Sequence, residues 1–266
     1  MTSTVPFQII DDDDDEFDWE AAVREIDASC ERANNPSSTT TWIYPVNVPL
    51  RDYQLAITKT ALFTNTLVAL PTGLGKTLTA AVVMYNYFRW FPDDLMERYG
   101  LGKKCSGKIV FAAPSRPLVM QQIEAWHNIV GTPQEWTIDM TGQVCPTKRA
   151  CFWKTKRVFF VTPQVLEKDI QSGTCLAKHL VCLVMDEAHR ASGNYSYCVA
   201  IREVLAIPVQ LRISALTATP GSKQPAVQHI IDNLQISALE YRSESDPDVI
   251  PYVDDRKIEL IEVALG

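Results

Sequence analysis

Five short apolar runs, each bounded by turn residues and followed by a helical pattern, constrain the fold of this chain more than any other feature. The runs span 67–70, 109–113, 158–161, 180–185 and 212–216. The helical patterns span 76–88, 118–129, 164–170, 197–205 and 226–234. Unbroken apolar runs are typical of strands that are buried on both faces of a parallel sheet. The alternation predicts an α/β fold with a mostly parallel, doubly wound sheet that binds ligands at the carboxyl ends of its strands.

A glycine-rich turn follows the first of these runs and opens a helix. Its sequence, at residues 71–77, is Pro-Thr-Gly-Leu-Gly-Lys-Thr. Two glycines let the backbone curl so that successive N–H groups point at phosphate oxygens, and the helix N-terminus adds its positive dipole. Lys76 is expected to hold the β- and γ-phosphates of ATP, and Thr77 to ligate Mg²⁺. The residues expected to bind the nucleotide here are Thr72, Gly73, Leu74, Gly75, Lys76 and Thr77.

Two adjacent acids follow the apolar run 180–185. Asp186 and Glu187 would lie at the carboxyl end of a buried strand, where a magnesium ion accounts for the paired charges. Asp186 is expected to ligate Mg²⁺ through its water shell, and Glu187 to accept a proton from the water that attacks the γ-phosphate. His189 is expected to couple this site to the next strand. Catalysis is therefore assigned to Glu187, Lys76, Asp186 and His189.

The last apolar run continues into Thr-Ala-Thr-Pro at residues 217–220. Thr217 and Thr219 offer hydroxyls that can couple the acid pair to a nucleic-acid face. By itself this segment is a β-branched strand that ends in a turn. Following the glycine-rich loop and the acid pair in this order, it favours an ATP-driven motor that acts on nucleic acid.

These three motifs, together with Leu-Arg-Asp-Tyr-Gln at residues 50–54, resemble superfamily 2 helicases with a DEAH box. Segments 44–54, 70–77 and 215–221 more narrowly resemble the FANCM family, the Fanconi anaemia DNA translocases related to archaeal Hef. The acidic start of the chain, with Phe17 and Trp19, resembles the plant form. The resemblance implies a single RecA-like P-loop NTPase domain. It also implies that Gln54 reads the adenine edge of ATP with support from Arg51.

The resemblance further implies DNA as the partner, because that family moves on DNA and remodels branched structures. It implies a nuclear location and protein partners from a DNA-repair complex. The contacts would hold phosphates without reading sequence. Basic residues at 148–149 and 154–157 either add positive potential or belong to a solvated helix face. The implied nucleic-acid contacts are Ser115, Arg116, Gln122, Thr141, Gly142, Thr162 and Pro163.

The acidic charge of the chain is concentrated at its N-terminus. Residues 1–35 hold 11 acidic residues and two arginines, a net charge of −9, whereas the remainder holds 21 acidic and 23 basic residues, a net charge of +2. The remainder is thus compatible with a phosphate-binding face. Residues 1–41 are expected to be a largely disordered acidic leader with an amphipathic helix at 17–26, which either solubilises the protein or binds a partner. Residues 42–243 would form the ATP-binding domain, and 244–266 a linker toward a second RecA-like domain.

Other segments and residue types give weaker expectations. No stretch approaches the ~18 apolar residues that a membrane helix needs, so we expect no membrane partner. The seven cysteines show neither a Cys-x-x-Cys pair nor a histidine at zinc spacing, which favours reduced, mostly buried thiols. Residues 92–106 mix charge with glycine and are expected to form a surface insertion.

Superfamily 2 motors use two RecA-like domains, and the second supplies arginines that stabilise the transferring phosphoryl group. An arginine of this kind is worth ~10³ to 10⁵ in rate. We therefore expect these 266 residues to bind ATP but to turn it over slowly, and to be a fragment of a longer translocase rather than a stand-alone module. Two other functions stay open: an RNA-acting relative of the sensor and Dicer-type helicases, and a non-catalytic interaction module with a vestigial ATP site.

Overall fold

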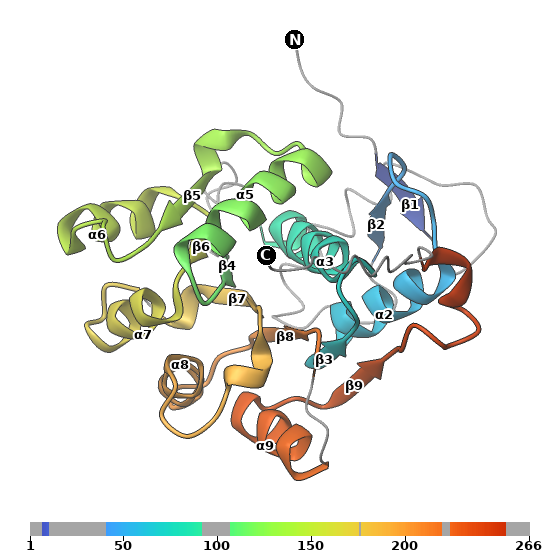
Figure 1. Ribbon diagram of the computed structural model, residues 1–266. Coiled ribbons are helices and arrows are strands. Elements are labelled where there is room, and N and C mark those ends of the chain that lie inside the picture. Colours follow the sequence, from blue (N-terminus) through green and yellow to red (C-terminus); the bar gives the residue numbers. More distant parts are fainter. Residues whose placement is uncertain (1–6, 11–40, 92–106, 176, 220–223, 254–266) are drawn as a thin grey trace, which may run out of the picture.

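One parallel sheet forms the centre of the molecule (Figure 1). The computed structural model describes residues 7–10, 41–91, 107–175, 177–219 and 224–253. The seven strands of the sheet lie in the order β5-β6-β4-β7-β8-β3-β9, and every pairing between them is parallel. This confirms the predicted α/β fold with a doubly wound sheet. The strands are β3 (Thr66–Ala69), β4 (Lys108–Ala112), β5 (Thr137–Met140), β6 (Val158–Val161), β7 (Leu180–Met185), β8 (Arg212–Thr217) and β9 (Ala238–Tyr241).

Helices cover both faces of the sheet. On one face lie α2 (Asp52–Phe63), α3 (Lys76–Trp90) and α5 (Arg116–Val130). On the other lie α6 (Pro146–Thr155), α7 (Pro163–Gln171), α8 (Ser196–Leu205) and α9 (Gln224–Leu234). Short 3-10 turns complete the described elements: η1 (Gln134–Trp136), η2 (Ala177–His179), η3 (Ala188–Arg190) and η4 (Ile250–Tyr252).

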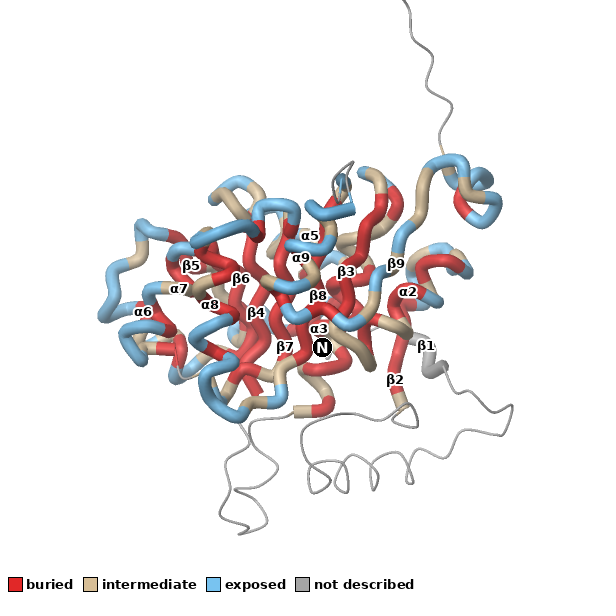
Figure 2. The backbone as a smooth tube through the Cα atoms, turned by 90° about the horizontal axis from the view of Figure 1, so that it is seen from below, coloured by how far each residue is buried: buried red, intermediate tan, exposed pale blue. Residues whose placement is uncertain are grey.

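The two cores explain why the strand sequences are unbroken apolar runs. Successive residues of a strand point to opposite faces of the sheet. In β4, Ile109 and Phe111 belong to the core under α3 and α5, whereas Val110 and Ala112 belong to the core under α7 and α8. Figure 2 accordingly shows the inner strands β6, β4, β7, β8 and β3 buried along their length, whereas the edge strand β9 and the helices and turns carry exposed surface. Both faces need apolar side chains, so apolar residues dominate the inner strands, and the few polar residues there, such as Ser214 of β8, are buried as well.

A small second sheet lies beside the main one. In it β1 (Phe7–Ile10) pairs antiparallel with β2 (Trp42–Pro45). The Asn86 side chain on α3 holds β2 in place, because its amide oxygen accepts from the Ile43 N–H at 2.8 Å and its amide nitrogen donates to the Ile43 carbonyl at 2.9 Å. The sequence did not predict β1, which falls within the expected leader. The expected helix at 17–26 and the insertion at 92–106 lie outside the described residues.

Three elements of the main domain were also not predicted from sequence: α2, β5 and α6. The strand β5 lies at the edge of the sheet, and its two middle residues are only partly buried, so it has no apolar run. The helix α6 buries only Arg149 and Trp153, and its remaining residues give no apolar stripe. In the described part of the chain, no helix is both long and apolar enough to cross a membrane.

Candidate nucleotide and nucleic-acid site

Backbone pairing brings the three sequence motifs together at one edge of the sheet, the edge formed by the carboxyl ends of its strands. The strand β8 pairs with β3 on one side and with β7 on the other, and all three run parallel. Their carboxyl ends therefore lie side by side. The glycine-rich loop follows β3, the threonine turn follows β8, and the acid pair follows β7. Motifs more than 100 residues apart in sequence thus share one edge, the usual ligand-binding position in such sheets.

The glycine-rich loop adopts a conformation that favours glycine at two positions. Gly73 has φ of 89° and Gly75 has φ of 96°, both in the left-handed region. A Cβ atom on Gly75 would also lie 2.2 Å from Nε2 of Gln54, whereas one on Gly73 would meet nothing within 4 Å. Lys76 begins α3, and its ammonium group donates to the carbonyls of Leu70 at 2.6 Å and Pro71 at 3.1 Å. The loop is therefore curled around its own lysine.

Gln54 and Tyr53 support the loop from α2. The amide nitrogen of Gln54 and the hydroxyl of Tyr53 each donate to the Leu74 carbonyl at 3.1 Å. Gln54 is only 3% exposed, because it packs directly against Gly75. Sequence reasoning assigned Gln54 to the adenine edge, which stays a prediction. What the structure shows is a brace between α2 and the loop, in which Tyr53 is a partner that the sequence did not single out.

Arg51 contacts a segment that sequence reasoning assigned to the linker. Its guanidinium carbon lies 4.8 Å from the ring centroid of Tyr252, in a cation–π geometry. The rings of Tyr53 and Tyr252 are 5.9 Å apart. Val249, on the same segment, is fully buried in the core under α3. The chain that follows β9 thus returns to pack against the residues that brace the loop.

The acid pair lies in a strained turn at the end of β7. Asp186 is only 8% exposed, and its carboxylate accepts from the Glu187 N–H at 2.9 Å. Glu187 has φ of 51°, which is unusual for a residue with a side chain. Tyr197 of α8 is fully buried, and its hydroxyl lies 2.8 Å from the carbonyls of both Asp186 and Ala112. Tyr197 therefore holds the turn against β4, and its sequence pattern, an aromatic on a helix, gave no sign of this contact.

Burial disfavours the charged forms of both Asp186 and Lys76. Burial raises the pKa of Asp186, and the nearby Glu187 adds to this, whereas the Glu187 N–H, Lys76 and His189 act in the opposite direction. Burial lowers the pKa of Lys76, against the attraction of Asp186 and Glu187. Both charged forms are thus less favourable than in water. Each would gain from a ligand that carries the complementary charge, phosphate for the lysine and a cation for the carboxylate.

His189 lies between the acid pair and β8. Its Nδ1 is 3.2 Å from a carboxylate oxygen of Glu187 and 3.3 Å from the hydroxyl of Thr217. The Thr217 hydroxyl also accepts from the Thr219 N–H at 3.2 Å. Sequence reasoning expected these residues to couple the acid pair to the next strand. The structure brings all four together, and the coupling role itself stays a prediction.

The site fits a magnesium-bound nucleotide. Asp186 and Thr77 carry oxygen atoms of the kind that Mg²⁺ prefers, and the curled loop and Lys76 carry N–H and ammonium groups that phosphates would contact. Among the described residues, no group of three or more His, Cys, Asp or Glu side chains could hold a metal ion.

The residues expected to contact nucleic acid continue along the same edge. Backbone hydrogen bonds join the strand ends there, from Asp186 N–H to Ala112, from Ala113 N–H to Val161, and from Thr162 N–H to Met140. Arg116 and Gly142 are exposed, and Ser115, Gln122 and Thr162 are partly exposed. Thr141 and Pro163 are buried, so little of either can be touched by a ligand. Ser115, Arg116, Thr141, Gly142, Thr162 and Pro163 lie at the ends of β4, β5 and β6, and Gln122 lies further along α5.

Two of the basic residues that were expected to add positive potential make internal contacts instead. Arg157 is buried, donates to the carbonyls of Phe88 at 2.8 Å and Phe91 at 2.6 Å, and stacks on the Phe88 ring at 4.0 Å. Arg149 is buried as well, in an ion pair with Asp169. Burial fixes both side chains by packing and hydrogen bonds. Lys148 and Lys154 are exposed and remain available to phosphates.

A glycine-rich loop, an acid pair and a threonine turn in this order along one edge of a parallel sheet define a RecA-like P-loop domain of the helicase type. A family model described as DEAD/DEAH box helicase matches residues 51–227, and the chain belongs to that family.

Individual relatives sharpen this assignment. The chain is 59% identical to "DEAD-box ATP-dependent RNA helicase FANCM" of Arabidopsis thaliana, over 100% of the chain and 24% of the relative. It is 45% identical to "ATP-dependent DNA helicase fml1" of Schizosaccharomyces pombe, over 86% of the chain and 26% of the relative. A crystal structure of the Pyrococcus furiosus Hef helicase domain superposes with a TM-score of 0.69 at 36% identity, covering 79% of this chain and 42% of that one. The resemblance to FANCM and Hef is thereby confirmed, and the chain spans about a quarter of the length of the two curated relatives.

Proposed function

We propose that this chain is the ATP-binding domain of a DNA translocase of the FANCM type, which couples ATP hydrolysis to the remodelling of branched DNA. The observation that carries the proposal is the shared edge of β3, β8 and β7, where loop, threonine turn and acid pair meet. The same edge continues to the turns expected to bind a phosphate backbone. Similarity to a relative named as an ATP-dependent DNA helicase supports DNA as the substrate. A nuclear location and partners in DNA repair follow from the same proposal.

Each residue at the edge has a role that matches its surroundings. Lys76 and the N–H groups of residues 73–77 would bind the phosphates, while Thr77 and Asp186 would hold the magnesium ion. When bound, the ion would neutralise charge that develops on the phosphates. Glu187 accepts a proton from the attacking water, and its strained backbone keeps the carboxylate beside His189. The contact between His189 and Thr217 then couples changes at this site to β8.

Nucleotide binding is tested by changing Lys76. In the 266-residue chain, Lys76→Ala is expected to weaken Mg·ATP binding at least about tenfold, because one charge-assisted contact to phosphate is lost. Lys178→Ala is the matched control, since Lys178 is exposed and precedes β7, at the opposite end of the strands. Isothermal titration measures both. If wild-type chain and Lys76→Ala bind equally well, the phosphate loop is not functional and the non-catalytic module becomes the better explanation.

The nucleic-acid preference is tested separately, because the relatives carry different names. The Arabidopsis relative is named an RNA helicase and the fission yeast relative a DNA helicase. We expect forked DNA to bind the chain more tightly than double-stranded RNA of equal length at the same salt concentration. Tighter binding of the RNA would favour an RNA-acting helicase.

Slow ATP turnover by the 266 residues alone stays a prediction of the same proposal.

A further inference from the structure

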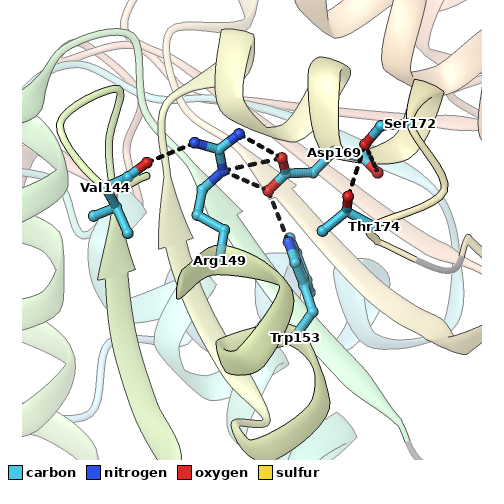
Figure 3. Close-up of polar contacts among 6 residues, drawn as sticks. All are labelled: Val144, Arg149, Trp153, Asp169, Ser172 and Thr174. Atoms are coloured by element: carbon cyan, nitrogen blue, oxygen red, sulfur yellow. Dashed lines mark hydrogen bonds and ion pairs between the residues drawn. The ribbon is translucent and has the colours of Figure 1, made fainter. Parts of the chain in front are cut away.

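A buried ion pair joins α6 to α7 beside the edge that the proposed function assigns to nucleic acid (Figure 3). Arg149 is bidentate toward Asp169: its Nε lies 2.9 Å and its Nη2 2.8 Å from the two carboxylate oxygens. Trp153 donates its indole N–H to the same carboxylate at 2.8 Å. The two charged side chains are only 10% and 2% exposed. All of the strong donors around Asp169 therefore come from α6.

A buried ion pair of this kind contributes little net stability to the folded chain by itself. Removing two charges from water costs several kcal/mol per ion, and a well-packed apolar pair of similar volume is often as stable. Arg149 and Trp153 are the only buried residues of α6, and Trp153 stacks on Phe159 of β6 with ring centroids 4.0 Å apart, so this helix is held to the domain by an aromatic contact as well as by the ion pair. The value of the pair must then lie in the geometry that it fixes, since a planar guanidinium sets direction as well as distance.

The geometry it fixes includes the turn after β5. The third nitrogen of the guanidinium, Nη1, donates to the Val144 carbonyl at 2.6 Å. Val144 in turn donates its N–H to the Thr141 carbonyl at 3.0 Å, which closes the turn that contains Gly142. Figure 3 shows Arg149 reaching from α6 toward Val144 on one side and Asp169 on the other. One guanidinium therefore holds the 141–144 turn.

The same guanidinium also holds the helix that begins after β6. Asp169 lies on α7, whose first residue is Pro163, directly after Thr162. Thr162 accepts from the N–H groups of Val165 and Leu166 at 3.0 and 3.2 Å, so its position moves with the helix. The β5–β6 pairing, which places Met140 beside Val161, sets the spacing of the two strand ends, and Arg149 adds a second link from the 141–144 turn through Asp169 to α7.

We propose that Arg149 and Asp169 are positioning residues for binding of the DNA backbone, which act by holding the part of the 141–144 turn that lies beyond the β5–β6 pairing against α7. The inference rests on the proposed function, because it assumes that both turns contact phosphates. Neither residue touches the nucleic acid: both are buried and each satisfies the other. Hydrogen bonds from turns to phosphates need donors at fixed spacing, and phosphate contacts set the register of the protein on the strand.

The test compares two variants with a matched control. Arg149→Lys keeps the charge but loses the fork that reaches Asp169 and Val144 together. The double variant Arg149→Met, Asp169→Leu removes both charges and leaves the net charge unchanged. The control Arg242→Met, Asp248→Leu removes the exposed pair after β9 with the same zero change in charge. Affinities for forked DNA and for Mg·ATP, melting temperature and amide exchange at residues 142–144 are measured for each.

Both Arg149 variants are expected to bind DNA about tenfold more weakly, as when charge-assisted contacts to phosphate are misaligned. Mg·ATP affinity should stay within about twofold of wild type, since the nucleotide loop lies beyond β7 and β8 in the sheet. Amide exchange at 142–144 should quicken, and the control should match wild type in every measurement.

Other outcomes distinguish a failure of the positioning role from a failure of the proposed function. Folded Arg149 variants that bind DNA as tightly as wild type would overturn the positioning role and leave the proposed function intact. Parallel losses of DNA and ATP affinity would also overturn it, because the pair would then support the whole domain. A wild-type chain that binds ATP but no DNA would instead overturn the proposed substrate, and the inference with it.

Discussion

At the scale of single residues, Asp186 shows how a functional group costs stability. Its pKa is raised above the ordinary value of 3.8, with burial as the main cause. The folded chain thus holds this proton more tightly than the unfolded chain, so stability falls as pH rises from the ordinary pKa to the raised one. Above that window the loss is complete. A role for this charge in holding a cation, as proposed, would account for keeping a carboxylate that costs stability.

We therefore predict that Asp186→Asn stabilises the chain at pH 7 and abolishes Mg²⁺-dependent nucleotide binding. The amide oxygen can still accept from the Glu187 N–H, so the turn should remain folded. Urea unfolding of both proteins at a series of pH values measures the difference in the free energy of unfolding. It should shrink to zero as the pH falls below the ordinary pKa of aspartate. A constant difference across pH would show that the buried charge is not its cause.

The residues of the site differ in how well sequence predicted them. Lys76, Asp186 and Glu187 could be found because their types are rare beside apolar strands, and a phosphate or a metal accounts for them. Tyr197 and Arg149 could not, since each acts through a backbone carbonyl or a partner far away in sequence. Such contacts depend on how two helices pack, and neither helix shows in its own sequence which strand end it faces.

At the scale of elements, the strands that were predicted carry apolar runs, and the elements that were missed do not. The runs at 158–161 and 180–185 match β6 and β7 to the residue, because central strands need apolar side chains on both faces. The edge strand β5 and the helix α6 escaped prediction, since β5 is half buried and α6 is held by an arginine. Hydrophobic periodicity in the sequence indicates which apolar groups are buried, and it gives no signal where polar contacts hold an element in place.

The small sheet offers a prediction about such a polar contact. Asn86→Ala should destabilise the chain by about 2–4 kcal/mol, because two buried backbone groups of Ile43 lose their partner and α3 gains a cavity. Amide exchange at residues 42–45 should quicken more than exchange in β6 or β7. Asn86→Asp is the informative comparison, since it keeps the acceptor for the Ile43 N–H and loses the donor to its carbonyl. Uniform quickening across the sheet would mean that β2 is not a separate unit.

At the scale of the whole molecule, the negative charge is concentrated at the start of the chain, where it would repel phosphates. Residues 1–35 carry a net charge of −9, against +2 for the rest. Exposed charges interact over about 10 Å at 0.1 M salt. A segment of this charge makes the local potential that a nucleic acid meets more negative, within about the screening length.

We predict that changing the five aspartates at residues 11–15 to asparagine tightens binding of forked DNA at low salt. The expected gain is up to about fivefold, or roughly 1 kcal/mol or less, because the interaction acts through solvent. Fluorescence anisotropy at two salt concentrations measures it, and the two proteins should converge at the higher one. A variant with the leader acids kept but shuffled should bind as wild type does, since only net charge enters the argument. If neutralisation weakens binding, or if the gain persists at high salt, the leader acts through a specific contact rather than through its field.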